Sequence, residues 1–200
     1  MTKANKIITG ILGGSFDPVH LGHIKLAQSA IESGKVDEVF FIPASQAPLR
    51  DAPTRVSPSQ RLDMLKIALS NFEYPFQIEE CEIERGEISY AIDTAKFLTE
   101  KYPNRQFKWI VGADHIGKLR KWKDIDTLAQ MISFICAKRI EFNADTTQLP
   151  PSVKLEFFDF TPIAHSSTKI RQNLADGKRN LFMLDQNVEK FILKNKLYNT

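Results

Sequence analysis

Short apolar runs alternate along the chain with stretches in which apolar residues recur every three or four positions. A short continuous apolar run predicts a strand that is buried on both faces, whereas the longer spacing predicts an amphipathic helix. The runs that predict strands are Lys6–Leu12, Glu38–Ile42, Phe76–Ile83, Phe107–Val111, Met131–Ala137 and Lys154–Phe160.

Helical patterns lie between these runs. One begins at Gly22, and another follows Ser57, where Pro58 takes the first helical position and Gln60 completes a Ser-x-x-Gln capping box. The other helical segments are Tyr90–Lys101, the segment opened by Ser166, and Val188–Leu197. The alternation predicts the α/β class: a Rossmann-like parallel sheet flanked by helices, with ligands at the carboxyl ends of the strands.

The composition fits a single α/β domain spanning residues 1–200. A chain of 200 residues can bury a sizeable core, and 42% hydrophobic with 26% charged residues is ordinary for a globular protein. The formal net charge of +3 comes without a dense basic block, which gives little support for nucleic-acid binding. We find no signal-peptide core and no stretch long enough to span a membrane.

The two cysteines, Cys81 and Cys136, are far apart in the sequence, and each lies in an apolar, strand-like run. We expect buried, reduced thiols rather than a disulfide or a metal pair. Reduced thiols fit a reducing compartment, so we expect a cytoplasmic protein.

A glycine-rich turn follows the first strand and leads to two histidines. Gly13 and Gly14 leave room for a phosphate to approach the backbone, because no Cβ stands in the way. His20 and His23 are three residues apart, so they project from one face of the first helical turn and can donate hydrogen bonds to phosphoryl oxygens. The alternatives are a zinc pair or two structural histidines, and no third ligand with sensible spacing is visible.

Near the other end of the chain, the segment 166–171 reads Ser-Ser-Thr-Lys-Ile-Arg and opens a helix with hydroxyls and two cations. Helix N-termini bind anions through free N–H groups and the positive end of the dipole. Two such termini, each carrying phosphate-binding side chains, predict a nucleoside triphosphate held between them.

A third glycine motif resembles a P-loop but lacks one of its essential residues. The segment 112–118 fits GxxxxGK, the start of a P-loop, but Leu119 follows where a P-loop needs Ser or Thr to hold Mg²⁺. Within this segment, Asp114 follows a strand and fits a helix N-cap.

The segment 13–23 resembles the HxGH signature of the nucleotidylyltransferase superfamily, and 166–171 resembles its ISSTxIR motif. Over nearly the whole chain the sequence is similar to one branch, the bacterial nicotinate-nucleotide adenylyltransferases of NAD synthesis. The matching segments are Gly13–His23 (GGTFDPxHxGH, with Ser15 for Thr), Arg61–Met64 (RxxM), Ser89–Thr94 (SYTxDT), Gly112–Trp122 (GxD…W) and the tail Val188–Tyr198.

The resemblance implies the nucleotidylyltransferase fold and transfer of AMP from ATP to nicotinate mononucleotide, giving deamido-NAD and pyrophosphate. The attacking phosphate is already an anion, so catalysis rests on positioning and charge neutralisation. His20 and His23 would hold the phosphates around the α-phosphorus, with His23 stabilising the transition state and Arg171 adding charge at the leaving pyrophosphate. The other expected ATP contacts are Ser166, Ser167 and Thr168 for the β- and γ-phosphates, Ser15 and Phe16 through their N–H groups, and Asp114 for the ribose.

For the mononucleotide, the resemblance implies that Trp122 stacks on the pyridine ring and that backbone N–H groups near Tyr90–Ala91 and Trp122–Lys123 bind its carboxylate. A surface cap over a helix is the alternative for Trp122, Tyr90 could simply pack, and Trp109 is expected in the core. Arg50 would supply a cation to the mononucleotide.

Three positions depart from the family pattern. Leu49 replaces a histidine beside Arg50, Ala91 replaces a threonine, and His165 stands where isoleucine is usual. Mg²⁺ would travel with ATP, held by phosphate oxygens and water, so no protein ligands are assigned to it.

Two rival functions stay open. Within the superfamily the acceptor could be nicotinamide mononucleotide, phosphopantetheine or another phosphate, and of these the nicotinamide form is the serious one. From a different class, the chain could be a non-catalytic pyridine-nucleotide sensor on the same fold.

Overall fold

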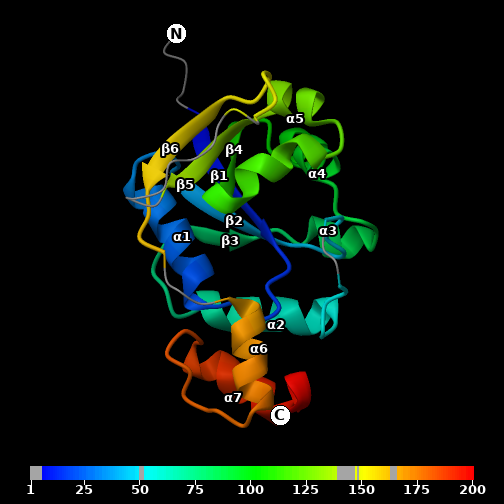
Figure 1. Ribbon diagram of the computed structural model, residues 1–200. Helices are drawn as coiled ribbons and strands as arrows, with labels where there is room; N and C mark the ends of the chain where they lie inside the picture. Colours follow the sequence, from blue (N-terminus) through cyan, green and yellow to red (C-terminus); the bar gives the residue numbers. More distant parts are fainter. Residues whose placement is uncertain (1–5, 50–51, 139–146, 148, 163–165) are drawn as a thin grey trace.

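The structure, a computed structural model, describes residues 6–49, 52–138, 147, 149–162 and 166–200. A six-stranded sheet in the order β3-β2-β1-β4-β5-β6 lies at its centre, and all neighbouring strands pair in parallel (Figure 1). The strands are β1 (Ile7–Gly14), β2 (Glu38–Pro43), β3 (Phe76–Ile78), β4 (Arg105–Gly112), β5 (Ser133–Lys138) and β6 (Leu155–Asp159).

Strand β1 lies in the middle of the sheet, with β2 on one side and β4 on the other. From β1 the chain builds the sheet outward through β2 and β3, and then crosses back to add β4, β5 and β6 on the other side. Open α/β sheets bind ligands at such a reversal, beyond the carboxyl ends of the strands. The ends in question are Gly14 of β1 and Gly112 of β4, which both belong to glycine-containing motifs of the sequence.

Helices flank the sheet and continue beyond one end of it. They are α1 (Leu21–Glu32), α2 (Pro58–Leu69), α3 (Cys81–Arg85), α4 (Ala91–Lys101), α5 (Ile125–Met131), α6 (Ser167–Ala175) and α7 (Gln186–Lys194), with 3₁₀ segments η1 (Ala113–Lys121) and η2 (Leu197–Asn199). In Figure 1, α6 and α7 lie together at the end of the sheet where α2 lies. In the described parts of the chain, no helix is long and apolar enough to cross a membrane.

Consecutive residues of the central strands pack alternately into two hydrophobic cores, one on each face of the sheet. Leu12 and Phe41 point to one face and pack with α1, α2, α6 and α7. Their neighbours Ile11 and Phe40 point to the other face and pack with α4, α5 and η1. Because both faces are covered, these strands are apolar at successive positions, which is why continuous apolar runs predicted them.

One predicted strand is wrong over half of its length. Phe76–Ile83 was expected to be a strand, but β3 ends at Ile78 and the chain forms α3 from Cys81 to Arg85. Two features that the apolar pattern does not show favour the helix. Glu82 accepts a hydrogen bond from Thr94 of α4, and Gly86 ends α3 in the left-handed conformation at φ 72°.

Smaller differences concern the ends of elements. Met131 belongs to α5 rather than to β5, and the last helix ends at Lys194 instead of Leu197, where η2 begins. Both cysteines are buried thiols as expected, although Cys81 lies on a helix and not in a strand. Burial, with the carboxylates of Glu79 and Glu82 nearby, raises the pKa of the Cys81 thiol to about 12.

Candidate active site

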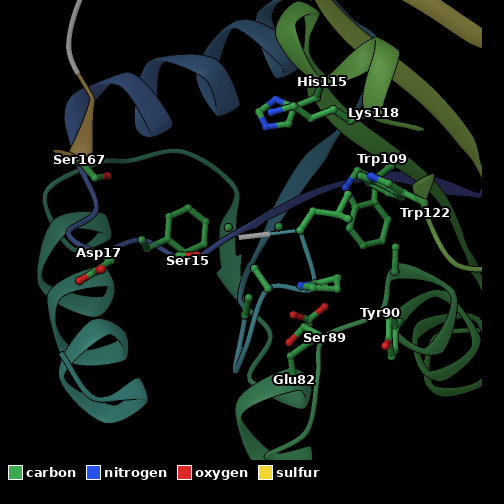
Figure 2. A pocket seen from close by; sticks show the side chains of 18 of the residues that line it. Ser15, Asp17, Glu82, Ser89, Tyr90, Trp109, His115, Lys118, Trp122 and Ser167 are labelled. Carbon is green, nitrogen blue, oxygen red and sulfur yellow. The ribbon is translucent and has the colours of Figure 1, made fainter. Parts of the chain in front are cut away.

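A cavity of about 830 Å³ lies where β1 and β4 end (Figure 2). This volume suits a small-molecule ligand. The turn after β1, the starts of α4 and α6, and η1 all contribute to its wall. Of the site residues predicted from the sequence, the cavity is lined by Gly13, Gly14, Ser15, Phe16, His23, Tyr90, Ala91, Trp122, Lys123, Ser167, Thr168 and Arg171.

Two of the predicted site residues lie outside the cavity lining, and two others are not described. His20 and Ser166 are not among the lining residues, and both are helix N-caps. Arg50 lies outside the described residues, as does His165, and the side chain of Asp114 is likewise not described. The roles expected for Arg50 and Asp114 therefore stay predictions.

The two histidines cap the helix that carries them. The His20 Nδ1 atom accepts a hydrogen bond from the Gly22 N–H (3.1 Å), and the His23 Nδ1 atom accepts one from the His20 N–H (3.2 Å). An imidazole that accepts at Nδ1 carries its proton at Nε2 when it is neutral. The caps therefore fix each ring as an Nε2–H donor, the form that can bond to a phosphoryl oxygen.

Packing keeps His23 neutral. Between ring centroids, His23 lies 3.8 Å from His20 and 5.1 Å from Phe16, and the Phe16 and His23 rings are nearly perpendicular. Burial, and secondly the charge that His20 could carry, lower the pKa of His23 well below its ordinary value. At neutral pH the side chain that faces the cavity is therefore an uncharged hydrogen-bond donor.

Across the described residues, no group of three or more His, Cys, Asp or Glu side chains comes together. The Nδ1 atoms of both histidines are also engaged in capping the helix.

The turn between β1 and α1 is held from three directions. Phe16 has a φ of 46°, and the buried Arg61 of α2 donates to the carbonyl oxygen of Ser15 at 2.8 Å. The carboxylate of Asp17, which is 1% exposed, accepts from the Arg55 N–H and from the Tyr198 hydroxyl, each at 3.0 Å. The C-terminal η2 therefore helps to fix the turn that lines the cavity.

The space next to the two glycines is occupied by aromatic rings. A Cβ on Gly13 would lie 3.2 Å from the indole of Trp109, and one on Gly14 would lie 3.1 Å from the ring of Phe16. Both separations are tight, so glycine is favoured at each position by packing alone. The approach of a phosphate to these glycines stays a prediction.

The start of α6 docks directly on the same turn. The Ser167 hydroxyl donates to the carbonyl oxygen of Pro18 (3.0 Å), and Arg171 donates to that of Asp17 (2.7 Å) and to the Thr168 hydroxyl (3.2 Å). Ser166 instead accepts from the Lys169 N–H, and Lys169 is exposed away from the cavity. The fold thus brings the two predicted phosphate-binding helix ends together.

Aromatic residues form the opposite wall. Trp122 is partly exposed to the cavity and packs edge-on against Trp109 (5.3 Å) and Phe134 (6.2 Å), so it is not a surface cap. The Lys123 ammonium lies 4.4 Å from the centre of the Tyr90 ring. Trp109 is buried as expected, and it also lines the cavity.

The start of α4 differs from the other two helix ends at this cavity. Within the described residues its N-cap, Tyr90, makes no side-chain capping bond, and Asp93 is the acidic side chain of its first turn. Backbone N–H groups at such an end can bind an anion.

Sequence reasoning missed several lining residues. His115, Lys118 and Lys121 of η1 line the cavity, and Figure 2 shows the first two on its wall. Part of η1 belongs to the segment whose sequence begins like a P-loop. The closely spaced basic side chains of these three residues were the available signal. Together with Lys123 and Arg171 they outnumber the acidic lining residues among those described, Asp17 and Glu82, which favours an anionic ligand.

Glu82 carried no signal of a site in the sequence. It lies on α3, is 4% exposed, and accepts a hydrogen bond of 2.6 Å from the Thr94 hydroxyl. Burial raises the pKa of Glu82, while hydrogen bonds from Thr94 and Ser89 and the charge of Arg85 act in the opposite direction.

Comparison with known proteins gives consistent matches. The model of the cytidylyltransferase-like family matches residues 11–173. A Halalkalibacterium halodurans protein named "Probable nicotinate-nucleotide adenylyltransferase" is 38% identical over 96% of this chain and 91% of its own length. An Opitutus terrae protein of the same name is 37% identical over 86% of each chain.

Solved structures agree at the level of the fold. The Plasmodium falciparum nicotinic acid mononucleotide adenylyltransferase complexed with NaAD has a TM-score of 0.77 and 21% identity, covering 96% of this chain and 98% of the other. The same enzyme complexed with APC has a TM-score of 0.76 and 20% identity, with the same coverage.

Proposed function

The chain belongs to the cytidylyltransferase-like family and, within it, to the nicotinate-nucleotide adenylyltransferases, and from that premise we propose that it transfers AMP from ATP to nicotinate mononucleotide. The products are deamido-NAD and pyrophosphate. The single observation that carries the proposal is the composition of the cavity wall, which combines side chains suited to phosphate, namely His23, Thr168 and Arg171, with a tryptophan suited to a ring, Trp122.

The phosphates of ATP would lie between the starts of α1 and α6. There the His23 Nε2–H, the hydroxyls of Ser167 and Thr168 and the guanidinium of Arg171 line one wall. An oxygen of the acceptor phosphate forms a bond to the α-phosphorus while the bond from that phosphorus to the β-phosphate oxygen breaks. The attacking oxygen is already anionic, so no general base is needed, and the work is positioning and charge neutralisation.

Two kinds of hydrogen-bond donor are available to neutralise the charge on the phosphates. His23 donates a hydrogen bond from a fixed ring, and its low pKa means that it adds no charge to the free protein. Arg171 keeps a permanent charge and is anchored by the Asp17 carbonyl. Preorganised donors of this sort stabilise charge that develops in the transition state, because they need not reorient as it develops.

Mg²⁺ is expected to enter with ATP. The two acidic side chains among the described lining residues are both engaged, Asp17 by Arg55 and Tyr198 and Glu82 by Thr94. Phosphate oxygens and water are then the natural ligands of the ion, and it supplies charge neutralisation on the phosphates.

The pyridine ring of the acceptor would stack on Trp122, with its carboxylate at the start of α4. Backbone N–H groups suit a carboxylate, because both of its oxygens accept hydrogen bonds. A carboxamide would present an NH₂ group to the same donors and leave a buried donor unpaired. This chemistry favours nicotinate over nicotinamide mononucleotide.

Incubation of the protein with ATP, Mg²⁺ and each mononucleotide in turn tests the proposal, with the dinucleotide product identified by mass. We expect deamido-NAD from nicotinate mononucleotide. Binding of the mononucleotide without any product would support the sensor function instead, and NAD formed from nicotinamide mononucleotide alone would leave the adenylyl transfer standing with a different acceptor.

A further inference from the structure

A buried carboxyl group borders the cavity at the end assigned to the acceptor. Glu82 is 4% exposed and lines the wall together with Ser89, Tyr90 and Ala91. Burial of a carboxylate is costly unless hydrogen bonds compensate for the lost water. An acceptor that carries a carboxylate of its own makes an acidic neighbour still less expected there.

Two hydroxyl groups compensate for the burial of Glu82. The Thr94 hydroxyl donates to the Glu82 carboxylate at 2.6 Å, and the Ser89 hydroxyl is also hydrogen-bonded to it. The Ser89 oxygen in turn accepts the N–H of Ser45 at 2.9 Å. A carboxylate oxygen accepts, so both hydroxyls act as donors to Glu82, while the Ser89 oxygen accepts from Ser45.

These bonds fix both sides of the same short segment. Ser89 immediately precedes the N-cap Tyr90, and Thr94 lies in the first turn of α4. Ser89 is further anchored to the loop after β2, where its N–H donates to the Gln46 carbonyl oxygen at 2.9 Å. Figure 2 shows Glu82 and Ser89 below the cavity, with Tyr90 beside them.

We propose that Glu82 is a positioning residue for the acceptor: through Ser89 and Thr94 it holds the start of α4 where its N–H groups meet the ring carboxylate. The proposal rests on the proposed function, because that function assigns the ring to this wall. Glu82 touches no reacting atom. It acts on acceptor binding, and it leaves the α1 and α6 ends, where ATP binds, unchanged.

Steady-state kinetics of four variants test this role. Glu82→Ala removes the carboxylate, Glu82→Gln keeps an oxygen that can accept from Thr94, and Thr94→Val removes one hydroxyl while preserving volume. We expect Glu82→Ala to raise the KM for nicotinate mononucleotide at least about tenfold, with kcat and the KM for ATP within about threefold of wild type. Glu82→Gln recovers part of the loss, and Thr94→Val shows a smaller change in the same direction.

Glu79→Gln, the fourth variant, is the matched control. Glu79 is a second buried carboxylate, 6% exposed, that is bonded to Lys101 and Tyr102 near the other end of α4 and does not line the cavity. We expect this variant to lower the melting temperature without changing the acceptor KM. A loss of acceptor binding in step with the loss of stability in both proteins would mean that Glu82 is only structural, which overturns the inference.

The remaining outcomes separate the two proposals. If the wild-type protein forms no deamido-NAD, the proposed function fails and this inference falls with it. If the wild-type protein forms it but Glu82→Ala leaves the acceptor KM unchanged, or raises both KM values alike, the inference alone is overturned. Should Glu82→Ala not fold, an unchanged acceptor KM in Thr94→Val overturns the inference in the same way.

Discussion

Two helix N-termini face the same cavity, and they differ in whether side chains cap their backbone N–H groups. At the start of α1, the rings of His20 and His23 accept the N–H groups of Gly22 and His20. At the start of α4, no side chain of the described residues caps the helix at Tyr90. The first helix therefore presents an imidazole to the cavity, whereas the second leaves its backbone N–H groups without a side-chain cap.

The difference matches the two kinds of anion that the proposed reaction brings to the site. Charge at the reacting phosphorus changes during the reaction, and a side-chain donor such as His23 can be placed at the atoms where it develops. The carboxylate on the pyridine ring only has to be recognised, which fixed N–H groups achieve without a charged side chain. Substitutions at the α1 end should thus lower turnover, and those at the α4 end should affect acceptor binding.

Loss of His23 should have the largest effect. His23→Ala removes one transition-state donor, which typically costs about 10²- to 10³-fold in kcat. His23→Gln separates this from the capping role, because glutamine at this helix position can still accept the N–H of the N-cap. We expect both variants to lose turnover and only His23→Ala to lose stability, as measured by kcat and thermal unfolding. More than about a third of wild-type kcat in His23→Gln would contradict the assigned role.

Arg171→Ala should have the second largest effect, at the α6 end. A hydrogen bond to a charged group contributes about 1.5–3 kcal/mol, so kcat/KM for ATP should fall roughly ten- to hundredfold. The KM for the mononucleotide should change little. Lys169→Ala is the control, because Lys169 lies on the exposed side of the same helix. Equal losses in the two variants would place the phosphate site elsewhere.

Trp122→Ala tests the other wall of the cavity. Stacking of a ring on an aromatic side chain contributes about 1–3 kcal/mol, so the KM for the mononucleotide should rise by about fivefold or more. The ring is common to both pyridine mononucleotides, so their KM values should rise together and keep their ratio. A change in the ratio would show that Trp122 itself selects between them.

The smallest effect concerns stability and pH. The pKa of His23 is lowered in the folded protein, so below the ordinary histidine pKa of about 6.5 the unfolded chain binds a proton that the folded protein does not. The free energy of unfolding should therefore fall as the pH is lowered from about 7.5 to about 5.5. This group contributes at most about 1.4 kcal/mol per pH unit to the fall. Denaturant titrations of wild type and His23→Gln check this, and identical pH slopes would contradict it.

The sheet was predictable because its strands are covered on both faces, which leaves a run of apolar residues in the sequence. The prediction of a strand over Phe76–Ile83 was wrong for its second half, where contacts between residues distant in the sequence, notably Glu82 with Thr94, favour a helix. Local apolar content cannot report such a contact. The helix starts at Ser57 and Ser166 carried their capping residues in the sequence and were found.

The same distinction applies to the site. His23, Arg171 and Trp122 stand in motifs, and the structure places all three on the cavity wall. Glu82, His115 and Lys118 reach that wall only because α3 and η1 pack with a particular side inward, which the sequence pattern does not specify. The capping role of His20 was also hidden, because histidine is not a common N-cap residue.

The relative use of the two pyridine mononucleotides tests the contrast between the helix ends most directly. We predict that kcat/KM for nicotinate mononucleotide exceeds that for nicotinamide mononucleotide by at least about tenfold, or about 1.4 kcal/mol, because backbone N–H groups at the start of α4, which has no side-chain cap, can pair with both carboxylate oxygens. Equal or better use of the nicotinamide form by the wild-type protein would contradict this contrast.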